Sequence, residues 1–401
     1  MDKIEELLSR GVDTIYPTRE ELEKVLRSDK KLKLYQGFDP TGIQMHIGHM
    51  VGLRKLAQFQ KLGHQVIFLI GDGTGLAGDP SGKTRGREKF LSREELRKNA
   101  TDYVKQAQKI VSFEGDNPVE ILFNGDWLTK LTLVDILEIA GNFTWQQLSE
   151  RDMFEDRAKK GEPINMREFL YPLLQGYDSV AMKVDLEIGG TDQTFNMLCG
   201  RTLVQNMLSK NKFVLTTPLL TDATGRKIGK TEGNVIALND KPEDLFGKIM
   251  ALSDDVIVKG LEYLTDVPMD EIEKINEAIT GGENPVKFKK QLAFEIVKQL
   301  NSDADARNAQ EHFEKTVQQK ELPDEVSVIE LDPNDNLISY SDLLVKTGLA
   351  SSKSEAKRLI EQGGVEVDNT RVENPNEEIT ITDELLLKVG KRKFVKVKVS
   401  S

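Results

Sequence analysis

The sequence predicts a doubly wound α/β domain, followed by an all-helical domain and a small α+β domain. Three observations lead to this order. Apolar segments of strand length alternate with helical patterns up to about residue 240. Helical patterns alone fill the stretch that follows. From about residue 339, short helical and short strand patterns are mixed. The first part therefore resembles a parallel sheet covered by helices.

The first predicted strand leads into a turn and then a helix. Residues 32–38 are an apolar alternating segment, and residues 39–42 form a turn rich in Pro and Gly. A helical pattern starts at His46-Ile47-Gly48-His49. The first turn of a helix presents unpaired N–H groups and a positive dipole end, which suits phosphate. Gly48 leaves room for a flat group such as a nucleobase to approach the backbone.

The second strand, residues 65–70, is almost continuously apolar, as expected in a buried parallel sheet. It is followed by residues 71–82, which contain too much glycine for a helix and predict a loop close to a ligand. Ser92 and Glu95 form a capping box for a helix that we expect to reach about Phe113.

Three further strand patterns complete the predicted sheet, at 119–123, 184–188 and 213–215. Strands that alternate with helices indicate a doubly wound, Rossmann-like sheet, in which ligands gather at the carboxyl ends of the strands. The glycine-rich segments 37–42, 71–82 and 189–190 each follow a strand. We therefore expect them to converge on one crevice.

The sequence divides at changes of pattern. We expect a catalytic domain over residues 1–238 and a helical domain over 239–322, in which Pro242, Pro268 and Pro285 begin helices. A linker rich in Pro, Asp and Asn follows over 323–338, and a small α+β domain over 339–401. In the last domain Ser352 and Glu355 cap a helix over 356–362, and strands follow at 365–367 and 379–381.

Composition narrows the class of protein. The 401 residues are 38% hydrophobic and 30% charged, which is typical of a soluble globular protein. Cys199 is the one cysteine, so an internal disulfide and a cysteine metal site are excluded. No segment resembles a signal peptide or a membrane span, so we expect a cytoplasmic protein. A net charge of −11 argues against a wholly basic nucleic-acid binder, although residues 339–401 carry 11 basic against 10 acidic residues.

A second motif lies at residues 225–234, Gly-Arg-Lys-Ile-Gly-Lys-Thr-Glu-Gly-Asn. Its glycines favour a mobile loop, and Lys227 and Lys230 can carry positive charge to a triphosphate. Neither motif is specific by itself. Histidines often cap helices, and a basic glycine loop is usually a solvated turn.

Together, in this order and on this fold, the two motifs resemble the HIGH and KMSKS signatures of class I aminoacyl-tRNA synthetases. Four further segments resemble bacterial tyrosine–tRNA ligases: 35–41, 78–82, 171–178 and 189–193. The segment 352–365 resembles the small RNA-binding domain, first known from a ribosomal protein, that ends many of these enzymes. The resemblance covers nearly the whole chain.

The resemblance implies a tyrosine site. Tyr35 and Asp178 would hold the substrate hydroxyl, and the α-amino group would be held by Asp79, Tyr171 and Gln175. An ammonium group requires acceptors and a negative partner, and a phenol can donate to a carboxylate where phenylalanine cannot. Tyrosyl-tRNA synthetases are themselves the known example of such selection, rejecting phenylalanine by about 10⁵ without editing. We therefore expect no editing domain.

The resemblance also implies an ATP site. His46, Gly48 and His49 would meet the nucleotide with Gly37 and Gly190, and Asp192 would bind the ribose. Gln193 would lie near the tyrosine carboxylate or the reacting phosphate, and Asp39 and Thr41 beside the phosphates. The groups that would clamp the departing pyrophosphate are Lys83, Arg87, Lys227, Lys230 and Thr231. For Lys83 and Arg87 a simply solvated loop is the alternative. Mg²⁺ would accompany the ATP, and no tightly bound metal is expected.

The implied reaction has two steps. The carboxylate of L-tyrosine attacks the α-phosphate of ATP, and a hydroxyl of the terminal adenosine of tRNA(Tyr) then attacks the tyrosyl-adenylate. The helical domain would read the anticodon, the last domain would bind RNA, and the enzyme would be a homodimer. The second signature departs from the family pattern, with Lys-Ile-Gly-Lys-Thr in place of Lys-Met-Ser-Lys-Ser. Gln36, Met50 and Gly52 receive no role.

Three rival functions remain open. A tryptophan–tRNA ligase shares the fold, but Tyr35 with Asp178 and the RNA-binding tail argue against it. Another HIGH-bearing nucleotidyltransferase would not need the helical domain and the tail. An RNA-binding scaffold without catalysis would not need to keep His46, His49 and Lys230. Such a scaffold would bind RNA without turning over ATP.

Overall fold

The computed structural model describes residues 2–80, 91–149, 152–228, 235–318, 328–331, 337–368, 370–381, 385–390 and 393–399. The chain divides into two compact units, Met1–Ala306 and Arg307–Ser401. The first unit holds both the α/β sheet and most of the helices that follow it. The finer division at residues 238, 322 and 338 stays a prediction.

The first unit is built on a six-stranded sheet in the order β1-β6-β5-β2-β3-β4. All neighbours are parallel except β1, which pairs antiparallel with β6 at one edge. The five predicted strands are confirmed, whereas β1 was not predicted. The bounds are β1 Thr14–Tyr16, β2 Lys33–Phe38, β3 Gln65–Ile70, β4 Glu120–Phe123, β5 Leu186–Gly190 and β6 Phe213–Thr217.

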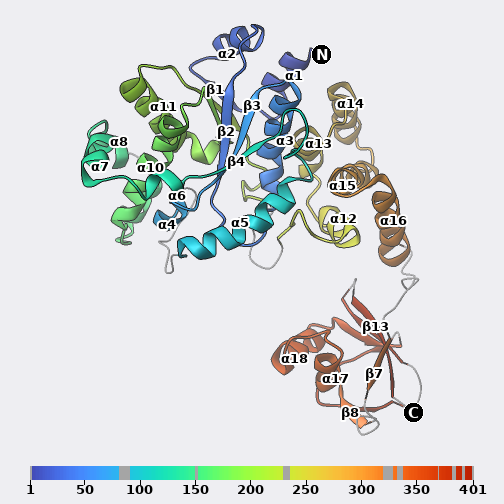
Figure 1. The fold of residues 1–401 in the computed structure, drawn as a ribbon. Coiled ribbons are helices and arrows are strands. Elements are labelled where there is room, and N and C mark those ends of the chain that lie inside the picture. The colour runs from blue at the N-terminus through green and yellow to red at the C-terminus, as the bar shows by residue number, and fades with distance from the viewer. Residues whose placement is uncertain are drawn as a thin grey trace. The chain divides into compact units, whose positions relative to one another are not determined.

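Helices cover both faces of this sheet, and this explains its apolar strands. Figure 1 shows α3 on one side, with α10 and α11 on the other. Every residue of β3 after Gln65 is buried, as expected for a strand covered on both faces. The chain progresses from β2 to β4 in one direction and from β5 to β6 in the other. The direction of winding therefore reverses between β2 and β5, which is where doubly wound sheets bind ligands.

The helices of the α/β part begin mostly where the sequence provides caps. Ser92 and Glu95 form the predicted capping box of α5, which ends at Ala107, before the predicted Phe113. The bounds are α1 Lys3–Ser9, α2 Arg19–Leu26, α3 Ile47–Lys61, α4 Thr74–Ala77, α5 Arg93–Ala107, α6 Gly125–Leu128, α7 Leu133–Ala140, α8 Trp145–Ser149, α9 Asp152–Lys159, α10 Met166–Met182, η1 Thr191–Gln193 and α11 Thr194–Leu208.

The helical turn α4 corrects the expectation that residues 71–82 contain no helix. Asn124 explains the difference, because its side-chain oxygen accepts from the backbone N–H groups of Gly73 (2.8 Å) and Thr74 (3.3 Å). These are the groups that a helix start leaves unpaired. A Cβ atom at Gly73 would lie 3.0 Å from the Gly125 backbone. Glycine is therefore required here by close packing.

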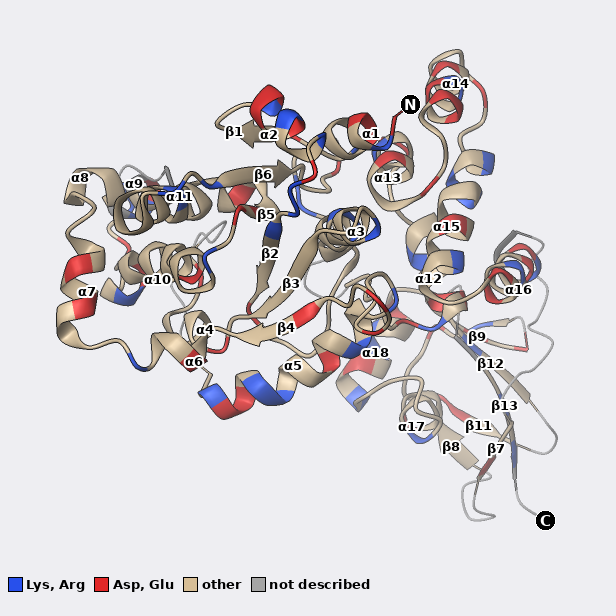
Figure 2. Ribbon diagram, turned by 45° about the horizontal axis from the view of Figure 1, so that its top comes forward, with Lys and Arg blue, Asp and Glu red and all other residues tan. Residues whose placement is uncertain are grey.

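After β6 the first unit contains helices, as predicted. Pro242 opens α12, and Pro268 and Pro285 directly precede α14 and α15. The bounds are α12 Pro242–Met250, α13 Val256–Leu264, α14 Met269–Thr280, α15 Val286–Leu300, α16 Asp303–Phe313 and the π-helical segment η2 Glu314–Gln318, the last two of which reach the second unit. Both signs of charge occur along α14, α15 and α16 (Figure 2). Arg54 links α3 to the helices that follow β6, because it donates to Thr265 O and Gln299 Oε1, each at 2.5 Å.

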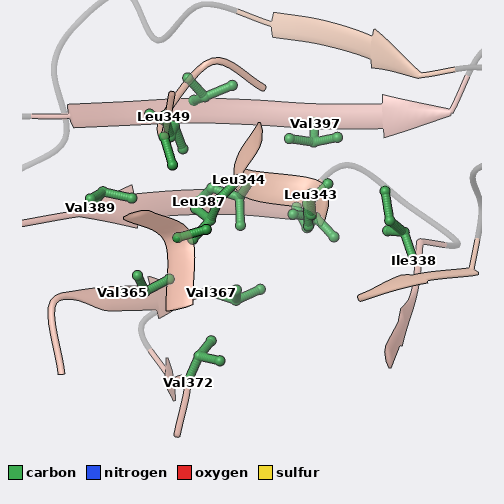
Figure 3. Packing of buried hydrophobic residues seen from close by; sticks show 14 of the residues in the cluster. Ile338, Leu343, Leu344, Leu349, Val365, Val367, Val372, Leu387, Val389 and Val397 are labelled. Carbon is green, nitrogen blue, oxygen red and sulfur yellow. The ribbon is translucent and has the colours of Figure 1, made fainter. Parts of the chain in front are cut away.

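The second unit has its own apolar core. Its larger sheet has the order β10-β9-β12-β13-β7, and β8 pairs with β11. Figure 3 shows Leu343, Leu387 and Val397 among the side chains that pack together. The bounds are β7 Val328–Leu331, β8 Leu337–Ser339, α17 Tyr340–Lys346, α18 Lys353–Glu361, β9 Val365–Val367, β10 Thr370–Arg371, β11 Glu378–Thr380, β12 Leu385–Val389 and β13 Lys393–Val399. The predicted cap of α18 is present, with Ser352 accepting from Glu355 N.

Candidate active site

A cavity of about 730 Å³ lies where the winding of the sheet reverses. Residues at or just beyond the carboxyl ends of β2, β3 and β5 line it, including Gly42, Gly71 and Gly190. The three glycine-rich segments thus converge, as predicted. The described residues among our site predictions all line this cavity: Tyr35, Gly37, Asp39, Thr41, His46, Gly48, His49, Asp79, Tyr171, Gln175, Asp178, Gly190, Asp192, Gln193 and Lys227. Lys83, Arg87, Lys230 and Thr231 lie outside the described residues.

The two histidines form the first turn of α3. His46 is the N-cap residue, and its Nδ1 accepts from Gly48 N at 3.1 Å. His49 Nδ1 accepts from His46 N at 3.0 Å, which completes a capping box. A ring nitrogen that accepts a hydrogen bond carries no proton. In both neutral rings the donor atom is therefore Nε2, and the two ring centres lie 3.9 Å apart.

The second signature is anchored beside the first. C-terminal to this signature, Ile236 O accepts from Ile47 N (2.9 Å), and Leu238 N donates to Met45 O (3.0 Å). Within the signature, Lys227 Nζ forms an ion pair with Asp192 Oδ2 at 2.7 Å. Described residues on either side of 229–234 are thus held beside the first signature or Asp192. The fold brings together two motifs that lie about 180 residues apart in the sequence.

The deep end of the cavity contains Tyr35 and Asp178, which are 0% and 1% exposed. Tyr35 Oη and Ser179 Oγ are 2.9 Å apart and share a hydrogen bond. Asp178 accepts from Asn124 Nδ2 (2.9 Å) and Trp127 Nε1 (2.8 Å). Burial raises the pKa of Asp178 well above its usual range, although these two donors partly oppose that shift. This end therefore presents a buried carboxylate beside a phenol.

Sequence reasoning missed Asn124 and Trp127. Asn124 directly follows the predicted strand 119–123, so its place at a carboxyl strand end was the available signal. Trp127 lies one turn further along, in α6. Salt bridges hold this segment, because Arg93 and Arg97 each bind Asp72, which is buried, and Asp126, which is exposed, at 2.6–2.8 Å. These ion pairs therefore help to hold in place the segment that carries the two donors to Asp178.

The other predicted tyrosine-site residues each have a hydrogen-bond partner among the residues that line the cavity, and for Gln175 it is Glu187. Tyr171 Oη donates to Asp39 Oδ2 at 3.0 Å, and Gln193 Nε2 donates to Asp79 Oδ2 at 3.0 Å. Burial raises the pKa of Tyr171 well above its ordinary value, and the nearby Asp39 adds to the shift. Asp39, which we had placed beside the phosphates, thus lies in contact with a residue predicted to bind the amino group. Carboxylates at this end of the cavity suit a cationic group.

The described residues contain no cluster of three or more His, Cys, Asp or Glu side chains that could hold a metal ion. Within the same part of the chain, no helix is both long enough and apolar enough to span a bilayer. Cys199, the one cysteine of the sequence, is buried.

Known families match both units. Residues 27–318 match the family described as tRNA synthetases class I (W and Y), and residues 341–385 match the S4 domain. The tyrosine–tRNA ligase of Thermotoga maritima is 42% identical over 393 residues, which are 98% of this chain and 96% of that protein. The tyrosine–tRNA ligase of Aquifex aeolicus is 42% identical and covers 94% of each chain.

Solved structures resemble the chain as well. A C-terminally truncated mitochondrial tyrosyl-tRNA synthetase from Aspergillus nidulans superposes with a TM-score of 0.64 at 27% identity, over 77% of this chain and 92% of that one. A tyrosyl-tRNA synthetase from Archaeoglobus fulgidus, complexed with L-tyrosine, has a TM-score of 0.60 at 23% identity, over 77% and 100% of the two chains. The second likeness concerns the fold alone.

Proposed function

Because the chain belongs to the class I tRNA synthetase family of tryptophan and tyrosine enzymes, and to its tyrosine–tRNA ligases, we propose that it charges tRNA(Tyr) in two steps. The carboxylate of L-tyrosine attacks the α-phosphate of ATP, forming tyrosyl-adenylate and releasing pyrophosphate. A hydroxyl of the terminal adenosine of the tRNA then attacks the adenylate, which yields tyrosyl-tRNA and AMP.

The observation that carries this proposal is that Tyr35 and Asp178 are both buried and both line the cavity. A phenol has one proton to donate and lone pairs to accept, so it can bond to Asp178 and to Tyr35 together. The indole of tryptophan only donates, and phenylalanine does neither. Asn124 and Trp127 hold the Asp178 carboxylate in place before the substrate arrives. This arrangement favours tyrosine over tryptophan.

The amino group of tyrosine would meet Asp79, Tyr171 and Gln175. The existing bonds from Tyr171 to Asp39 and from Gln193 to Asp79 hold Tyr171 and Asp79 in position. When tyrosine binds, its ammonium group would share Asp79, and Gln193 would turn toward the carboxylate or the reacting phosphate. An ammonium gains most from a charged acceptor in a site shielded from water.

ATP would bind at the start of α3. The Nε2 atoms of His46 and His49 would donate to phosphate oxygens, while Gly37, Gly48 and Gly190 allow the nucleotide to approach the backbone. Thr41 would add a hydroxyl donor at the phosphates. Lys227 is paired with Asp192 in the structure. ATP would separate this pair, because Asp192 would bind the ribose and Lys227 the pyrophosphate.

No side chain needs to act as a nucleophile in this mechanism. The enzyme orients the carboxylate against the α-phosphate and stabilises the charge that develops on the phosphate oxygens. Lys83, Arg87, Lys230 and Thr231 would complete the pyrophosphate clamp, as the family resemblance implies. Mg²⁺ would enter with ATP as part of the substrate. No editing step is proposed, since the hydroxyl contact itself discriminates against phenylalanine.

The partner is tRNA(Tyr). We assign anticodon recognition to residues 239–322 and further RNA contacts to residues 339–401, which contain the match to the S4 domain. Residues 323–338 would link the two.

We further propose a homodimer, because apolar side chains are exposed on α7, α8 and α10. Leu133, Leu137, Trp145 and Met166 are 71%, 62%, 60% and 66% exposed. Exposed apolar groups gathered on neighbouring helices are typical of an interface.

A charging assay tests the proposal. Purified protein, ATP and labelled tyrosine should convert tRNA(Tyr) into labelled tyrosyl-tRNA, with one AMP formed for each tyrosine transferred. Without tRNA, labelled tyrosine should stay bound to the protein through gel filtration only when ATP is present, because the adenylate is held in the cavity. Charging without an adenylate that can be isolated or trapped would contradict the two-step mechanism.

A further inference from the structure

A buried ion pair lies at the tyrosine end of the cavity, and its acidic member is part of the cavity lining. It joins Glu187 of β5 to Lys212, which directly precedes β6, and the two residues are 2% and 0% exposed. Lys212 Nζ also donates to Ser179 Oγ (2.7 Å) and Met197 O (3.2 Å). All three ammonium hydrogens thus have acceptors. Neither residue has a role in the reaction described above, and the burial of two charges carries a desolvation cost that their pairing only partly offsets.

The two helices beside this pair leave room for it. A Cβ atom at Gly200 of α11 would lie 2.5 Å from Lys212 Nζ, and one at Gly176 of α10 would lie 3.0 Å from Gly200 N. The two glycines therefore allow α10 and α11 to pack closely and leave space beside Gly200 for the ammonium group of Lys212. A larger residue at position 200 would displace the ammonium group from Glu187.

Glu187 lines the cavity and contacts Gln175, which lines it as well. Glu187 Oε2 binds Lys212, while its other oxygen, Oε1, accepts from Gln175 Nε2 at 3.1 Å. A carboxylate can only accept, so it determines which end of the Gln175 amide faces it. Gln175 Oε1 is buried and accepts no hydrogen bond from any residue in the described ranges. Buried acceptors are almost always satisfied in native proteins, so a missing donor at a cavity indicates a ligand group.

We propose that Glu187 is a positioning residue that turns the carbonyl oxygen of Gln175 toward the α-amino group of tyrosine. Lys212 neutralises Glu187, so that Glu187 orients the amide and does not compete for the ammonium group itself. The inference rests on the proposed function. It gives a role to Glu187, a carboxylate that is paired with Lys212 and lines a site for a cationic group. Glu187 itself need not touch the substrate.

The test compares two ligands that differ only in the amino group, L-tyrosine and 3-(4-hydroxyphenyl)propionate. Their dissociation constants are measured by calorimetry for the unaltered protein and for Glu187→Leu/Lys212→Met, in which both charges are removed together. The preference for tyrosine should fall about tenfold or more, the effect of one charge-assisted hydrogen bond. The dissociation constant of the propionate should change by less than about twofold, because its phenol contacts are intact.

A matched control removes another buried ion pair, Arg157 with Glu168, by Arg157→Met/Glu168→Leu. This pair does not line the cavity, so the ligand preference should be unchanged. If Glu187→Leu/Lys212→Met does not fold, Glu187→Gln serves instead, since a glutamine can face Gln175 with either end and should still lower the preference. Parallel weakening of both ligands, or an unchanged preference, would overturn the inference. Failure of the unaltered protein to bind tyrosine would instead overturn the proposed function.

Discussion

Replacing Asp178 by alanine should weaken tyrosine activation strongly. In the structure this carboxylate is 1% exposed and accepts from Asn124 Nδ2 and Trp127 Nε1. The substrate hydroxyl would be a third donor to it. A hydrogen bond to a charged group contributes about 1.5–3 kcal/mol, and its loss here also leaves a phenol buried without an acceptor. We therefore expect a loss of at least about 2–3 kcal/mol of transition-state stabilisation.

The assay is the rate of pyrophosphate exchange as a function of tyrosine concentration. The predicted loss corresponds to a decrease in kcat/KM for tyrosine of about 30- to 150-fold. Activation of phenylalanine, which makes no bond to Asp178, should decrease far less, so the variant should discriminate less between the two amino acids. Circular dichroism and the melting temperature serve as controls for folding. An unchanged kcat/KM for tyrosine in a folded variant would remove Asp178 from the tyrosine pocket.

Three further predictions concern other parts of the molecule. Lys230→Ala should lower the rate of adenylate formation in stopped-flow experiments far more than it raises the KM for tyrosine, and the reverse would mean that the loop binds substrate without stabilising the transition state. Gly71→Ala places a Cβ atom 1.8 Å from Asp39 Oδ1, so kcat/KM for tyrosine should fall at least about tenfold, and an unchanged value would contradict the close approach. Burial lowers the pKa of Lys55 to about 7, so the folded state binds the proton of this side chain more weakly than the unfolded state does. The free energy of unfolding should therefore rise with pH between about 7 and 10, by up to about 1.4 kcal/mol per pH unit. Lys55→Met should remove that rise in the free energy of urea unfolding, and an equal rise in both proteins would refute the assignment.

Much of the fold could be predicted because its signals are local. The apolar segment Gln65–Ile70 matches β3 residue for residue, and Ser92 with Glu95 marks the start of α5. In contrast, β1 has three residues and pairs with β6, about 200 positions away, so no local pattern distinguishes it. The turn α4 was missed because the capping group belongs to Asn124, some 50 residues further along the chain.

The site shows the same division between local and long-range information. Motifs and strand ends identified the residues that line the cavity, such as His46 and Tyr35, because doubly wound sheets place ligands at carboxyl strand ends. The residues that support the site were not predicted. Asn124 and Trp127, which follow β4, bind Asp178 of α10, and Lys212, which directly precedes β6, binds Glu187 of β5. These contacts depend on how the sheet and helices pack, which no short segment of the sequence records.

The most direct test of the whole account is pyrophosphate exchange into ATP without tRNA, run separately with tyrosine, tryptophan and phenylalanine. We predict exchange with tyrosine alone, because only its phenol can bond to both Tyr35 and Asp178. Exchange with tryptophan would show that the deep end of the cavity has been misinterpreted. Absence of exchange with all three amino acids, in protein shown to be folded, would contradict the proposed catalysis and favour an RNA-binding role without it.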